Sequence, residues 1–170
     1  LLGSQAVQFA LVWWLTATTG SATILAAATL VAFLPQVALG PFIGALVDRW
    51  DRRRVMLAAD GAAALAAALL ALAFAAGRAG TAEVLVLLFT RAVCGAFHAP
   101  AALASTSLMV PEKHLIRIQG LNQALQGGLL IVAAPIGAFL FAGLPMAGVL
   151  AVDVVTALMA ILPLLFTPVP

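Results

Sequence analysis

The chain has 170 residues, of which 65% are hydrophobic and only 8% charged, and its formal net charge is +2. An ordinary soluble domain has about a quarter charged residues, so this composition excludes a water-soluble globular fold. Four of the eight basic residues lie in one short segment, which excludes an extended nucleic-acid-binding face. The single cysteine, Cys94, excludes an internal disulfide and a paired metal-thiolate site.

Six hydrophobic segments follow one another along the chain, separated by short polar or turn-forming breaks. Residues 1–47 and 118–152 have no ionisable side chain, and each stretch is far longer than the ~20 residues that cross a bilayer. The runs lack the alternation typical of barrel strands. We therefore predict an all-α membrane protein, with one six-transmembrane-helix bundle over residues 1–170. The expected helices span about 3–19, 21–47, 54–76, 82–110, 115–142 and 146–166.

The positions of lysine and arginine predict the orientation, because cytoplasmic loops are enriched in both. Four arginines lie between the second and third expected helices, and Lys113 and Arg117 lie between the fourth and fifth. The connections on the other side contain only Arg78. We expect a multi-pass protein of the plasma (inner) membrane with both termini in the cytoplasm. Because the chain starts at Leu1 without methionine, it is expected to be a fragment.

The segment of residues 40–54 is the most informative part of the sequence. Gly40 and Gly44 are four residues apart on one expected helix, which favours close approach of a neighbouring backbone. Asp51 precedes the third expected helix, where a carboxylate can cap the helix and suits its dipole. Asp48 lies beside arginines that could hold it in a charge network.

This segment resembles the motif G-x-L-x-D-R-x-G-R-R of the major facilitator superfamily, placed in the cytoplasmic loop between that family's second and third helices. Asp51 stands where the motif has its second glycine. The residues that match the motif are Gly44, Leu46, Asp48, Arg49, Arg52 and Arg53.

Two further segments extend the resemblance over nearly the whole chain. Arg91 followed by Gly95 is similar to the family's fourth-helix motif. Residues 134–137, Ala-Pro-Ile-Gly, are similar to its antiporter motif, although Ala134 stands where glycine is typical. The loop pattern and the Pro100-Ala101 pair most resemble the branch of drug, macrolide and siderophore exporters.

The resemblance implies one half of a twelve-helix fold, in which substrate is held between two six-helix halves. The expected function is proton-coupled efflux of small hydrophobic compounds by alternating access. Its expected partners are the lipid bilayer, a small-molecule substrate and a missing C-terminal six-helix half, with no nucleic acid. A proton gradient would supply the energy, and neither a cofactor nor a metal is expected.

Two alternatives remain open at this stage, an importer of a small nutrient and a non-transporting six-helix membrane scaffold. An enzyme is not expected. The sequence has no paired catalytic carboxylates at close spacing, no His-Glu-x-x-His run and no Gly-x-Ser-x-Gly elbow.

The resemblance predicts a conformational-switch loop of Gly44, Asp48, Arg49, Arg52 and Arg53. Asp60 lies two turns into the third expected helix, and we expect it to belong to the charge network of this loop.

Four residues of the later helices are candidates for coupling or for lining the cavity: Arg91, Gly95, His98 and Asp153. Arg91 and Asp153 fall at similar depths, so an ion pair between them is allowed, and it would offset the cost of charges within the bilayer. His98 could exchange protons or serve as a hydrogen-bonded core residue.

Polar and aromatic residues of the first and fifth expected helices are candidates for a substrate cavity, although hydrogen bonds and packing between helices would explain them equally well. These candidates are Gln5, Gln8, Trp13, Asn122 and Gln126.

Overall fold

A computed structural model describes residues 2–47 and 49–166, apart from the side chains of residues 45, 107 and 165. Within these ranges the chain forms six helices and no strand, which confirms the predicted all-α fold. The helices are α1 (Leu2–Thr19), α2 (Ala22–Val47), α3 (Arg52–Ala75), α4 (Thr81–Met109), α5 (Glu112–Gly143) and α6 (Met146–Phe166).

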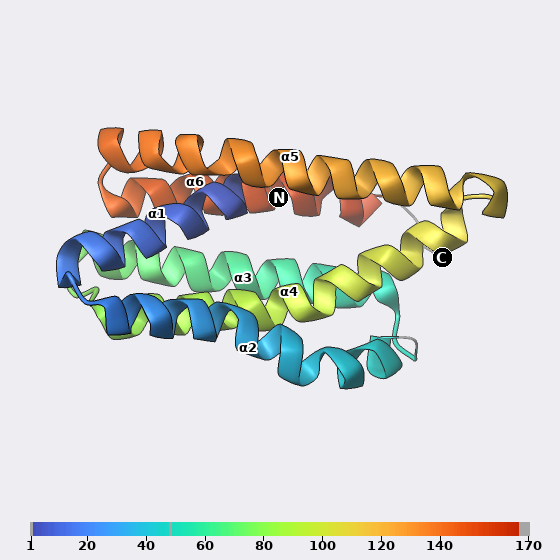
Figure 1. Ribbon diagram of the computed structural model, residues 1–170, viewed down its shortest axis with the longest axis horizontal. Coiled ribbons are helices and arrows are strands. Elements are labelled where there is room, and N and C mark those ends of the chain that lie inside the picture. Colours follow the sequence, from blue (N-terminus) through green and yellow to red (C-terminus); the bar gives the residue numbers. More distant parts are fainter. Residues whose placement is uncertain (1, 48, 167–170) are drawn as a thin grey trace.

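The helices lie side by side along the long axis of the bundle and alternate in direction (Figure 1). The α1–α2, α3–α4 and α5–α6 turns lie at one end, which we call the turn end, and the α2–α3 and α4–α5 connections lie at the other, the loop end (Figure 1). Gly20 (φ +59°) and Gly77 (φ +67°) take left-handed conformations that glycine adopts without steric cost, which lets α1 and α3 end in tight turns.

Helix packing places α3 between α4 and α6, while α2 packs against α4 and α1 packs against α5. The larger of the two hydrophobic clusters includes Leu11, Leu15, Leu88 and Leu150, all fully or almost fully buried. The smaller cluster joins the ends of α2 and α3, and Ile43 and Val47 pack there with Val55 and Met56.

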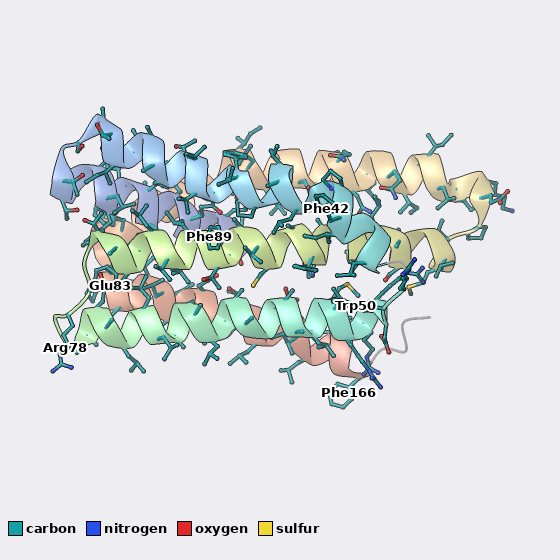
Figure 2. The ribbon with its side chains drawn as sticks, turned by 90° about the horizontal axis from the view of Figure 1, so that it is seen from below. Phe42, Trp50, Arg78, Glu83, Phe89 and Phe166 are labelled. Carbon is teal, nitrogen blue, oxygen red and sulfur yellow. The ribbon has the colours of Figure 1, made fainter. Side chains whose placement is uncertain are left out.

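Large apolar side chains also cover the outside of the bundle. Phe42 is 75% exposed, Phe139 80% and Ile116 90% (Phe42 is labelled in Figure 2). A soluble protein rarely exposes so much apolar surface, whereas a bilayer solvates it. Accordingly, the five helices α2 to α6 are long and apolar enough to cross a membrane.

Helix α1 is the shortest of the six described helices. With 18 residues it is long enough to cross a membrane, but among the described helices it alone is not apolar enough to count as a candidate membrane span. Gln5 and Gln8 lower its hydropathy. It nevertheless lies lengthwise within the bundle, beside α5 and α6 (Figure 1).

Candidate functional site: charges between the helices

A largely buried ion pair joins α4 to α6. The side chains of Arg91 and Asp153 are only 10% and 4% exposed, and Arg91 Nη1 contacts Asp153 Oδ2. The second terminal nitrogen of Arg91 donates a hydrogen bond to the Ser4 carbonyl of α1 at 2.8 Å. The ion pair that the sequence allowed is thus formed, and three helices meet at one guanidinium.

One carboxylate oxygen of this ion pair lacks a hydrogen-bond donor among the described residues. Asp153 Oδ1 is buried and has no hydrogen-bond partner among the described residues. A buried carboxylate oxygen without a donor carries an uncompensated desolvation cost. This desolvation cost is lowered when the carboxylate binds a proton, or when water or a ligand donates a hydrogen bond to the oxygen.

A second pair joins α3 to α4. His98 Nε2 lies 3.4 Å from Asp60 Oδ2, and the two side chains are 30% and 28% exposed. Asp60 therefore pairs with a residue of α4, because α3 packs against α4. Its expected membership of the charge network of the α2–α3 loop stays a prediction, since Asp48 lies outside the described residues.

The α2–α3 loop shows local contacts. Asp51 caps α3 as predicted, since its carboxylate accepts a hydrogen bond from the Arg54 backbone nitrogen at 3.1 Å and lies 3.4 Å from Arg54 Nε. Arg53 Nε donates to the Leu164 carbonyl of α6 at 2.9 Å. Arg52 Nε is buried without a hydrogen-bond partner in the described chain, whereas Arg49 is exposed. Asp48 lies outside the described residues, so its place in a loop network stays a prediction.

The expected close approach at Gly40 and Gly44 is absent from the described contacts. A Cβ built on either glycine meets nothing within 4 Å. The close approaches lie elsewhere: a Cβ on Gly137 of α5 would overlap the Ala6 carbonyl of α1, and one on Gly3 would overlap the Thr156 hydroxyl of α6. These two contacts let α1 lie tightly against both neighbours.

Gly95 of α4 is in looser surroundings than Gly137. A Cβ there would lie 3.9 Å from Gln36 Nε2 of α2, an ordinary contact distance. The glycine therefore faces α2, but the contact does not require the absence of a side chain.

The polar and aromatic candidates on α1 and α5 are not gathered into a described pocket. Gln5 and Gln126 are exposed, and Gln8 and Asn122 are half-buried. Trp13 is 53% exposed and stacks on Phe9 of its own helix, with ring centroids 6.2 Å apart. Two grooves of the described structure lie between α3 and α4 instead.

Sequence reasoning missed three contributors to these contacts. The Ser4 carbonyl is a backbone group, so no side-chain pattern indicates its role at Arg91. Gly137 was noted only as part of a family motif, although its contact with α1 is a packing role. Trp50 stacks on Phe97 of α4, with centroids 6.5 Å apart and planes 9° apart, which joins the loop to the bundle.

Antiparallel apolar helices with an exposed apolar surface and with paired charges between them define a multi-pass helical membrane protein. Comparison with known families assigns this protein more narrowly. The Major Facilitator Superfamily matches residues 1–170, so the chain belongs to that family.

The chain is similar to bacterial efflux proteins. It is 36% identical over 170 residues to macrolide efflux protein A of Streptococcus pyogenes, which covers all of this chain and 42% of that protein. It is also 36% identical over 151 residues to macrolide efflux protein A of Enterococcus faecalis, covering 89% of this chain and 46% of that protein. A shorter match of 36 residues, 58% identical, links 21% of the chain to 8% of an uncharacterized MFS-type transporter of Mycobacterium tuberculosis.

The chain thus spans less than half the length of these relatives. No solved structure matches it.

Proposed function

We propose that this chain is one half of a secondary transporter that exports small hydrophobic compounds, with macrolides as the first class to test. The observation that carries the proposal is the 36% identity to a macrolide efflux protein over the full length of the chain. An importer of a small nutrient is disfavoured by that likeness.

Transport requires a second six-helix unit in this proposal. The chain corresponds to less than half of its relatives, and the face that carries Gly40 and Gly44 has no neighbour within 4 Å of either glycine. A helix of the second unit can pack closely on that face. Substrate would bind between the two units, and their rocking would expose it to each side of the membrane in turn.

Proton exchange at the Arg91–Asp153 pair would couple the cycle to the proton gradient, with no cofactor. The open Oδ1 of Asp153 supports this assignment. Protonation there would neutralise the carboxylate and weaken its hold on Arg91. The hydrogen bond from Arg91 to the Ser4 carbonyl would then weaken as well, so protonation would free α1 to move relative to α4.

The proposed site of action is the plasma membrane, with the loop end of the bundle in the cytoplasm. The concentration of arginine in the α2–α3 loop and the pair Lys113 and Arg117 support this orientation.

Accumulation of a radiolabelled macrolide in cells expressing the full-length protein tests the proposal. Expression should lower accumulation relative to an empty vector, and a protonophore should remove the difference. Inverted membrane vesicles should take up the macrolide when acidified inside. Accumulation raised in intact cells would indicate import instead.

Two substitutions address the mechanism at matched expression. Asp48→Asn should reduce export, because the proposed switch loop loses a charge. Arg91→Gln should reduce export and also abolish proton release on addition of substrate, measured with a pH-sensitive dye in detergent. Normal proton release in Arg91→Gln would remove Arg91 from the coupling step.

A further inference from the structure

A groove of about 620 Å³ lies between α3 and α4 at the loop end of the bundle. The inner part of the groove is lined by apolar side chains. On α3 these are the alanines at positions 58, 59 and 62. Alanine has no atoms beyond Cβ, so these positions leave room between the two helices. Ala58 and Ala62 are exposed, which means that the groove opens to the outside of the bundle. From α4 it is lined by Val93, Cys94 and Phe97.

The mouth of this groove is basic and aromatic. Arg49, Trp50, Asp51 and Arg54 lie there, and the Arg54 side chain is 86% exposed. The Asp51 carboxylate already caps α3 and lies 3.4 Å from Arg54 Nε, so it offsets at most one guanidinium. Among the described residues at the mouth, two arginines and one aspartate leave an excess of positive charge.

The same two helices form a second groove at the turn end, which serves as an internal comparison. It measures about 450 Å³ and is also lined by alanines, including Ala66, Ala73 and Ala82. Its charged lining residue is Glu83, and Arg78 lies at that end but outside the lining. Figure 2 shows Trp50 at one end of the α3–α4 pair and Glu83 at the other. Both grooves have an apolar inner lining, and they differ in the charge of the residues at the mouth.

We propose that the groove at the loop end binds a membrane phospholipid with an anionic headgroup. Arg49 and Arg54 hold the headgroup phosphate, since guanidinium groups match phosphate oxygens in charge and geometry. One acyl chain lies along Ala58 and Ala62. From Arg54 to Ala62 the helix rises about 12 Å, at ~1.5 Å per residue, which accommodates a large part of one acyl chain.

Three features select this occupant. The groove opens on the apolar outer surface, where its environment is lipid rather than water. Basic pockets between membrane helices attract anionic headgroups. Trp50 lies at the level of the mouth, and tryptophan favours the headgroup region of a bilayer. Lipid binding requires neither export nor proton coupling, so the inference stands apart from the proposed transport function.

Native mass spectrometry of the full-length protein in detergent tests the site, with phosphatidylglycerol and phosphatidylcholine of identical acyl chains as probes. Phosphatidylglycerol should bind more tightly. In the double variant Arg49→Gln/Arg54→Gln its affinity should fall about tenfold or more, because each arginine near a headgroup contributes roughly a fivefold factor. The double variant Lys113→Gln/Arg117→Gln, in the other basic loop, should stay within about twofold of the parent.

Filling the groove gives an independent test that leaves both arginines in place. Ala62→Phe should displace phosphatidylglycerol, whereas Ala73→Phe, which fills the groove at the turn end, should not. A thermal unfolding curve in the same detergent establishes that each variant is folded; if Ala62→Phe does not fold, the arginine variant decides.

Three results would overturn the proposal. One is equal binding of the two lipids, and another is an equal loss in the Lys113→Gln/Arg117→Gln control. The third is crosslinking of an Ala58→Cys variant to another segment of the same polypeptide, which would show that protein fills the groove.

Discussion

The Arg91 guanidinium is held by a carboxylate from α6 and by a backbone carbonyl from α1. Both partners are needed because a guanidinium within an apolar bundle loses its hydration and must recover hydrogen bonds from protein. The His98–Asp60 pair differs, since its side chains are about three times as exposed as that of Arg91 and its imidazole is charged only when protonated.

Removing one partner of the Arg91–Asp153 pair should be costly. Asp153→Asn leaves the buried guanidinium without its anion, and we expect the free energy of unfolding to fall by about 3–5 kcal/mol. Denaturant titration of the full-length protein in detergent measures this loss. The double variant Arg91→Gln/Asp153→Asn should recover part of the stability, because no lone charge remains. Strictly additive losses would show that the two residues do not stabilise each other.

The same substitution at the more exposed pair should cost much less. For Asp60→Asn we expect a loss of at most about 1 kcal/mol, because asparagine can still hydrogen-bond the imidazole and no permanently charged partner is left unpaired. Measurement under identical conditions gives a direct comparison with Asp153→Asn. A loss as large as that of Asp153→Asn would mean that Asp60 is buried in the full-length protein.

At the scale of elements, α3 begins at Arg52 because Asp51 satisfies a backbone donor of its first turn. We expect Asp51→Ala to destabilise the protein by about 1 kcal/mol, and Asp51→Asn to be nearly neutral, since asparagine caps equally well. Denaturant titration distinguishes the two. Equal losses in both variants would assign the effect to the ion pair with Arg54 instead of the cap.

Helix α1 makes two close contacts at glycines, one where Gly137 of α5 lies against α1 and one where its own Gly3 lies against α6. Gly137→Ala would place a methyl group against the Ala6 carbonyl, and we expect overpacking to cost about 1–3 kcal/mol. Gly128→Ala on the same helix is the matched control, because a Cβ there meets nothing within 4 Å. The control should be neutral or slightly stabilising in the same unfolding assay. If both variants behave alike, the α1–α5 contact is looser than described.

For the whole molecule, the charge distribution predicts sidedness. In a cysteine-free background, Arg78→Cys at the turn end should react with a membrane-impermeant maleimide on intact cells. Lys113→Cys and Arg54→Cys at the loop end should react only after permeabilisation, because basic loops remain in the cytoplasm. Labelling of Lys113→Cys on intact cells would reverse the proposed orientation.

Several features of this protein follow from its sequence alone. Long uncharged runs specify membrane helices, and glycine- and proline-containing breaks specify where the chain turns, because both depend on local composition. The Asp51 cap could also be predicted, since its donor lies three residues away. The similar depth of Arg91 and Asp153 could be predicted by counting residues along the two helices.

Other features were decided only by the tertiary structure, because they depend on which faces of distant helices meet. The pairing of Asp60 with His98, the close approach of Gly137 to α1 and the groove between α3 and α4 all require the rotation of each helix about its axis. A helix that is apolar on every side leaves little in its own sequence to fix that rotation. Packing of small residues and the few buried charges fixes it instead.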